Sequence, residues 1–125
     1  MAATPESKVK KQVVRILVAY ASESGYNAYY FYPATGGYGK SGVADIITCL
    51  GGSFVAIECK AWPNKLTPLQ QKNMLDVVKA KGVGISVDDR TLDKFAALLP
   101  RLGQFGPGYY NLIDDARENT KIKTE

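Results

Sequence analysis

The feature that most constrains the fold is a pair of glycines, Gly51 and Gly52, between two strand-like runs, residues 43–50 and 53–60. Consecutive glycines between two such runs are a typical β-hairpin signal. The position of the turn decides which residues lie opposite one another, and a two-residue turn or a four-residue loop gives the same register. The sequence therefore predicts an antiparallel hairpin of defined register.

This register brings charged side chains together. Asp45 is predicted to lie opposite Glu58, and Val43 opposite Lys60. Because side chains alternate along a strand, Asp45, Glu58 and Lys60 are expected to project from one face. Two opposed carboxylates are destabilising unless something cationic binds between them, and a hard divalent ion would add to the charge of Lys60. The alternative is that the three side chains form only a solvated charged face.

The rest of the chain predicts an α/β fold, a mixed β-sheet flanked by helices in the order α-β-β-β-α-β-α. Thr-Pro pairs begin two helices, since a hydroxyl caps the helix and proline suits its first position. We treat residues 1–125 as a single domain with a frayed tail over about 118–125. Besides the hairpin, the expected elements are helices over residues 5–24, 68–81 and about 90–102, the last capped by Asp88 or Asp89, and strands over residues 27–33 and 83–87.

Composition removes several kinds of chemistry. The chain has no histidine, which excludes histidine metal sites and histidine-based catalytic triads and dyads. Cys49 and Cys59 are too few for a disulfide framework or a four-thiolate zinc site. A net charge of +4 permits an anionic partner without proving one. We find no secretory signal and no run long enough to span a membrane, and expect a cytoplasmic protein.

The hairpin residues resemble a known family. An acid, Asp45, followed by Glu58-Cys59-Lys60 on the next strand, is similar to the signature of the PD-(D/E)xK nucleases. With the glycine-rich run over residues 33–42 and the Leu-Thr-Pro-Leu-Gln run over residues 66–70, the chain resembles the small stand-alone VRR-NUC nucleases of phages and bacteria. The resemblance covers about residues 4–87. It departs at Ala44, where that family commonly has proline before the acid; neither residue is a ligand.

The resemblance implies a role for each matching residue. Asp45, Glu58 and the backbone carbonyl of Cys59 would hold Mg²⁺ or Mn²⁺. Lys60 would orient the attacking water and offset charge on the phosphate. The chemistry would be metal-assisted hydrolysis of a phosphodiester bond, which needs no histidine.

Two further residues have competing interpretations. Gln70 is either the partner of Thr67 in a capping box or a catalytic residue that positions Lys60 or water, and both roles are compatible. Glu6 is either an acid favoured by the helix dipole or an additional metal ligand acting through water.

The glycine-rich loop is predicted to approach nucleic-acid phosphate through Gly37, Tyr38 and Lys40, with Lys65 as a further contact. Its alternative is a plain connection. The loop is one residue away from a P-loop, but a strand follows it where a P-loop would open a helix, so no nucleotide cofactor is expected.

The resulting hypothesis is a Mg²⁺-dependent, structure-selective endonuclease for DNA. The resemblance is also to Holliday-junction resolvases, which implies branched DNA such as four-way junctions as the substrate and a homodimer as the acting form. The alternatives are a non-catalytic nucleic-acid-binding module on the same fold and a restriction-type endonuclease. A pure binder would not need the set of Asp45, Glu58 and Lys60, and a restriction enzyme needs a recognition element for which 125 residues leave little room.

Overall fold

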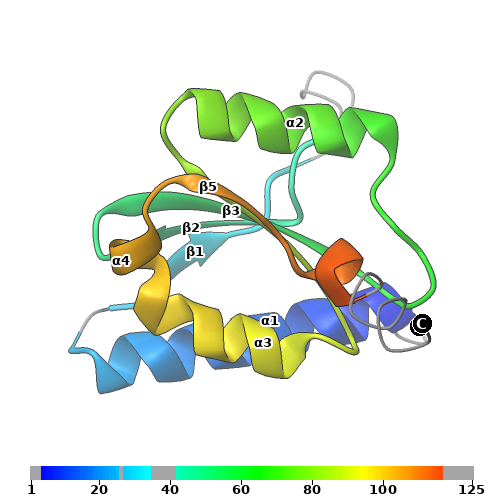
Figure 1. Cartoon of the computed structure of the whole chain (residues 1–125). Coiled ribbons are helices and arrows are strands. Elements are labelled where there is room, and N and C mark those ends of the chain that lie inside the picture. The colour runs from blue at the N-terminus through cyan, green and yellow to red at the C-terminus, as the bar shows by residue number, and fades with distance from the viewer. Residues whose placement is uncertain (1–3, 26, 35–41, 117–125) are drawn as a thin grey trace, which may run out of the picture.

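A five-stranded mixed sheet separates two layers of helices, with α2 on one face and α1 and α3 on the other (Figure 1). The computed structural model describes residues 4–25, 27–34 and 42–116. In chain order the elements are α1 (Pro5–Glu23), β1 (Tyr29–Phe31), β2 (Ile46–Leu50), β3 (Ser53–Lys60), α2 (Pro68–Lys79), β4 (Val83–Asp88), α3 (Leu92–Leu98), the 3₁₀ turn η1 (Leu99–Arg101), α4 (Leu102–Phe105) and β5 (Gly108–Asn111).

The strands lie in the order β1-β2-β3-β4-β5. The first three are antiparallel, whereas β3, β4 and β5 are parallel. Parallel neighbours need a crossover, which α2 provides between β3 and β4 on one face and α3 between β4 and β5 on the other. The predicted mixed α/β sheet flanked by helices is therefore confirmed.

The hairpin has the predicted register over its paired length, from Ile46 opposite Ile57 to Leu50 opposite Ser53. Gly51 and Gly52 have φ angles of 57° and 88°, which glycine adopts without steric cost. The predicted start of its first strand at Val43 is wrong, because β2 begins at Ile46.

Beyond this ladder, Val43 is not paired with Lys60. In the described sheet Lys60 instead pairs with Asp88 of the parallel strand β4. The last residue of β3 is thus paired with β4 rather than with Val43.

Both Thr-Pro pairs begin helices as predicted. Thr4 accepts a hydrogen bond from the backbone N–H of Ser7 at 3.1 Å, and Thr67 accepts one from that of Gln70 at 3.2 Å. The face of α1 that packs on the sheet repeats every four residues, at Val9, Val13, Leu17 and Ala21.

The C-terminal half differs from the prediction. The third helix begins after Thr91 rather than Asp88 or Asp89, since Asp88 completes β4. It ends at Leu98 and continues as a 3₁₀ turn, because Pro100 has no N–H for a helical hydrogen bond. The predicted order also lacked β5, a four-residue strand that is stable only beside β4. The predicted frayed tail lies outside the described residues.

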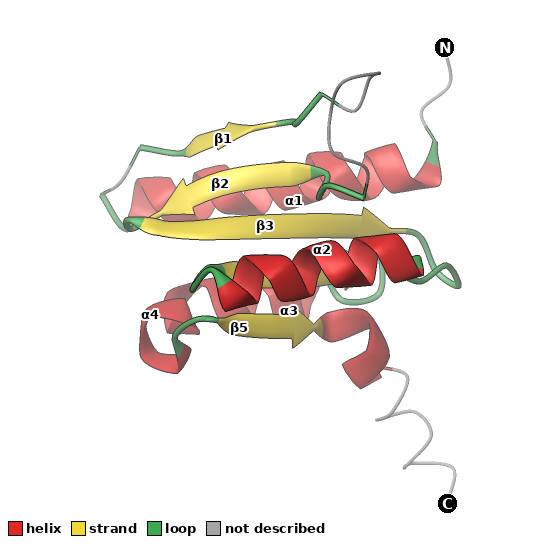
Figure 2. Ribbon diagram, turned by 90° about the horizontal axis from the view of Figure 1, so that it is seen from above, coloured by secondary structure: helices red, strands yellow, loops and turns green. Residues whose placement is uncertain are grey.

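The helix α2 covers only part of its face of the sheet. It packs on β3, β4 and β5, and Figure 2 shows that β1 and β2 extend beyond it. Tyr29, Phe31 and Phe54 are about half exposed. Over the described ranges, the structure has no helix with the length and apolar character that a membrane span requires.

Candidate active site

Asp45 and Glu58 are held together by two reciprocal hydrogen bonds where the β2–β3 ladder ends. The backbone N–H of Asp45 donates to Oε2 of Glu58 at 3.0 Å, and the backbone N–H of Cys59 donates to Oδ2 of Asp45 at 2.8 Å. The carboxylate of Asp45 thus binds the backbone of β3, and that of Glu58 binds the backbone just before β2, in place of the regular strand pairing predicted there. These two hydrogen bonds fix both acids in position.

Glu58 is a buried acid, with 2% of its surface exposed. Burial and, to a smaller extent, the nearby charge of Asp45 raise the pKa of Glu58 to about 8. A hydrogen bond between the Glu58 and Asp45 side chains also favours the protonated form of Glu58. The two carboxyl groups are therefore close enough to share a proton, and a cation could take the place of that proton.

Lys60 lies two residues beyond Glu58 on β3, so its side chain leaves the same face of the sheet. Only 9% of Lys60 is exposed, and its charge lowers the pKa of Glu58. Among the described residues its ammonium group forms no ion pair. The structure therefore brings Lys60 close to the acid pair, as predicted, and leaves its charge available.

Gln70 completes the predicted capping box and also contacts Glu58, while its predicted role in positioning Lys60 or water stays a prediction. Its Oε1 accepts a hydrogen bond from the backbone N–H of Thr67 at 2.9 Å, which completes a capping box at the start of α2. Its Nε2 donates to Oε1 of Glu58 at 2.5 Å. One side chain thus begins the helix and orients the buried acid.

Cys59 contributes only its backbone to the site. Its side chain is fully buried on the opposite face, and burial raises the pKa of the thiol, so it is not a nucleophile.

Glu6 lies in the first turn of α1, where Nδ2 of Asn64 makes a long contact with its Oε2 at 3.5 Å. Within the described part of the chain, no group of three or more His, Cys, Asp or Glu side chains could hold a metal ion, so Glu6 does not complete such a group with Asp45 and Glu58. Its predicted role through water stays a prediction.

Gly42, the last glycine of the glycine-rich run, lies against Leu69 at the start of α2. A Cβ atom on Gly42 would lie 2.9 Å from the backbone oxygen of Leu69, so only glycine allows this close approach. The predicted phosphate contacts Gly37, Tyr38 and Lys40 lie outside the described residues. Lys65 is exposed in the connection between β3 and α2.

A partly buried polar network beside Glu58 was not predicted from the sequence. Ser86 of β4 pairs with Glu58 across the ladder, and its hydroxyl bonds to Oδ1 of Asn111 at 2.7 Å and accepts from the hydroxyl of Tyr109 at 3.2 Å. Nδ2 of Asn111 donates to Asp114 at 2.8 Å. Burial raises the pKa of Tyr109, so its hydroxyl stays a donor. The network escaped prediction because it requires β5.

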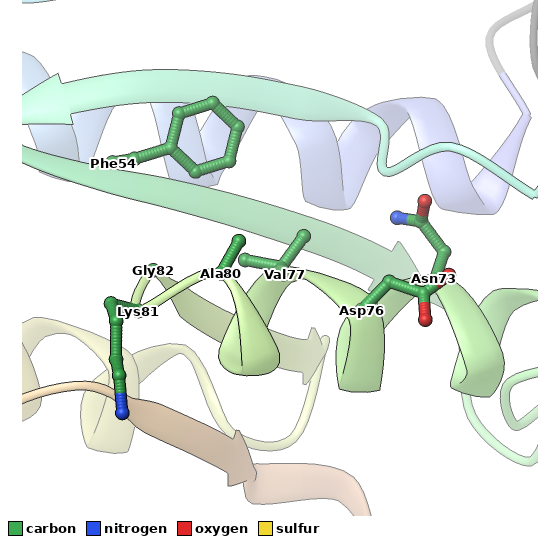
Figure 3. Close-up of a pocket in the computed structure, with 7 residues that line it drawn as sticks. All are labelled: Phe54, Asn73, Asp76, Val77, Ala80, Lys81 and Gly82. Carbon is green, nitrogen blue, oxygen red and sulfur yellow. The ribbon is translucent and has the colours of Figure 1, made fainter.

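A hollow of about 450 Å³ lies at the other end of the sheet, between α2 and the start of β3 (Figure 3). Phe54 extends from β3 on one side, and Asn73 and Val77 line it from α2. Glu58 and Lys60 are at the opposite end of β3. None of the described residues that line the hollow is a predicted site residue. This hollow is therefore separate from the candidate site.

The raised pKa of Glu58 predicts how stability depends on pH. The ordinary pKa is 4.5, so the unfolded chain loses this proton well before the folded protein does. We expect the metal-free protein to lose stability as the pH rises from about 5 through about 8, because the folded state must give up a proton that the unfolded chain has already lost. Thermal unfolding in EDTA at several pH values measures this. Glu58→Gln should flatten the curve, and an unchanged slope would contradict the assignment.

No known protein-family model matches the chain, and no curated protein matches it either.

Proposed function

We propose that this protein is a metal-dependent endonuclease that hydrolyses phosphodiester bonds in DNA. The observation that carries the proposal is the acid pair Asp45 and Glu58, held by reciprocal hydrogen bonds beside the positive charge of Lys60, which has no ion-pair partner among the described residues. The order of elements from α1 to β4 and the residues at the end of the hairpin favour the PD-(D/E)xK assignment of VRR-NUC type.

The donor set fits a hard divalent ion. Asp45 and Glu58 offer carboxylate oxygens, and their mutual repulsion, which raises the pKa of Glu58, is relieved by a cation. With the carbonyl of Cys59, these residues would hold Mg²⁺ or Mn²⁺. Such an ion would lower the pKa of water and stabilise negative charge on the phosphate.

The protein's own groups have separate tasks. Gln70 and the backbone N–H of Asp45 each bind one oxygen of Glu58, so the carboxylate cannot rotate away. Lys60 provides a buried positive charge and three N–H donors, which suit the developing charge of a phosphate under attack.

We expect the substrate to be branched DNA, such as a four-way junction. A domain of this size has little surface for reading base sequence, so DNA shape is the more accessible signal. Cutting two opposed strands requires two sites, which favours a homodimer related by a two-fold axis.

The test is cleavage of a four-way junction, a flap, single-stranded DNA and plain duplex by the purified protein. We expect cutting with Mg²⁺ or Mn²⁺, none in EDTA, and a preference for the branched substrates. Cutting that persists in EDTA would overturn the mechanism, and equal cutting of all four substrates would overturn the structural selectivity. Tight binding to junctions without cutting under any metal would instead favour the non-catalytic module.

A further inference from the structure

The tryptophan Trp62, which is the only one in the sequence, is exposed directly beyond the strand that carries Glu58 and Lys60. About 45% of its surface is exposed. Its backbone N–H donates to Oδ1 of Asp89 at 2.8 Å, and the guanidinium of Arg90 lies 3.6 Å from the centre of its ring. The ring is thus held at the surface by the residues that follow β4.

The residue that braces the ring is itself anchored. Nη2 and Nε of Arg90 bind Oδ2 of Asp88 at 3.0 and 3.3 Å, and Asp88 is fully buried at the position of β4 paired with Lys60. Arg90 therefore holds its place without a ligand. A large aromatic surface that is rigid before binding loses little entropy when a partner packs on it, which is typical of binding hot spots.

Two hollows of about 300 and 400 Å³ adjoin Trp62 and the start of α1. Lys8, Gln12 and Asp89 contribute polar groups to the first, and Glu6 and Asn64 to the second. These side chains include hydrogen-bond donors and acceptors, and both positive and negative charges. A phosphate only accepts hydrogen bonds and would be repelled by the carboxylates of Glu6 and Asp89, whereas the edge of a nucleobase presents donors and acceptors together.

We propose that Trp62 is a stacking platform for an unpaired nucleobase of the bound strand. This inference rests on the proposed function and specifies it, since it requires a substrate with a base out of the duplex close to the scissile bond. Trp62 is four residues from Glu58, a span of at most about 13 Å along the chain, which corresponds to a few nucleotides. Single strands and the branch points of junctions or flaps provide such bases.

Since Trp62 is the sole tryptophan, its fluorescence reports on this position alone. The experiment titrates the protein in EDTA, where no cleavage is expected, with a short single-stranded deoxyoligonucleotide and with an abasic strand of equal length and charge. We expect the base-bearing strand to quench the fluorescence and the abasic strand to leave it nearly unchanged. A fully paired duplex should quench less than the single strand.

Variants separate stacking from general binding. Trp62→Ala should weaken the binding of the base-bearing strand by about 5- to 150-fold, the usual worth of one stacked base, and leave the affinity for the abasic strand unchanged. Trp62→Phe should retain much of the affinity. The matched control is Phe54→Ala, which removes a similarly exposed aromatic ring at the far end of β3.

Equal quenching by both strands would overturn the proposal, as would equal losses in Trp62→Ala and Phe54→Ala. A Trp62→Ala variant that binds both strands normally would also overturn it, because the ring would then serve another class of partner. Because every measurement is made in EDTA, base-specific quenching without cleavage in Mg²⁺ would support the platform while the nuclease proposal fails.

Discussion

Lys60→Ala is expected to reduce DNA cleavage by about 100- to 1,000-fold or more, the usual loss when one group that stabilises transition-state charge is removed. Its ammonium group is buried beside the acid pair and has no ion-pair partner in the described structure, so its charge is available to a phosphate. Binding of the same DNA in EDTA should change little, because many phosphate contacts across a surface share the affinity. Cleavage rates and binding isotherms on one labelled junction measure both effects.

The contrast to this variant is Lys40→Ala in the glycine-rich loop. It should weaken DNA binding and make the plot of log affinity against log salt concentration less steep by about 1, the change expected for one lost phosphate contact. Cleavage at saturating enzyme should change less. If Lys60→Ala lost as much binding as cleavage, Lys60 would be a docking residue. Lys60→Gln keeps most of the side-chain volume and provides a second variant if Lys60→Ala folds poorly.

Asp45→Asn is expected to stabilise the metal-free protein and to abolish its response to Mg²⁺. An asparagine can still accept the hydrogen bond from the backbone N–H of Cys59, while the charge facing Glu58 is removed. The free energy of unfolding in EDTA should increase by on the order of 1 kcal/mol. This difference should grow as the pH rises through about 8, where Glu58 loses its proton.

Scanning calorimetry with and without Mg²⁺ measures the response of each protein to the ion. Mg²⁺ should raise the melting temperature of the original protein, because the ion binds the folded site and scarcely the unfolded chain, and should do little for the variant. The variant should also be inactive. If Asp45→Asn has a lower melting temperature in EDTA, and Mg²⁺ still raises it as much as it does for the original protein, the two acids do not share a metal.

The sequence predicted the hairpin well because its information is local. Gly51 and Gly52 determine the turn, and the turn determines every pair outward to Ile46 and Ile57. The prediction failed where side chains replace the ladder, since Asp45 binds the backbone of Cys59 through its carboxylate rather than through strand pairing.

The C-terminal region was harder to predict, for a physical reason. The strand β5 has four residues and no hairpin partner, and its stability comes from a parallel neighbour more than twenty residues earlier in the chain. Patterns within a short window carry no signal of such a contact. The network of Ser86, Tyr109 and Asn111 depends on the long-range pairing of β4 with β5, and the brace on Trp62 depends on that of β3 with β4.

The double hydrogen bonding of Gln70 restricts which residue that position can accept. Glutamate caps a helix after Thr67 as well as glutamine does, and by the standards of helix stability the two are interchangeable. Here a glutamate would place a third carboxylate beside those of Asp45 and Glu58. It would also lack the amide N–H that Gln70 donates to Glu58. Over evolutionary time the helix would tolerate the exchange and the site would not, so position 70 should vary much less than a capping residue normally does.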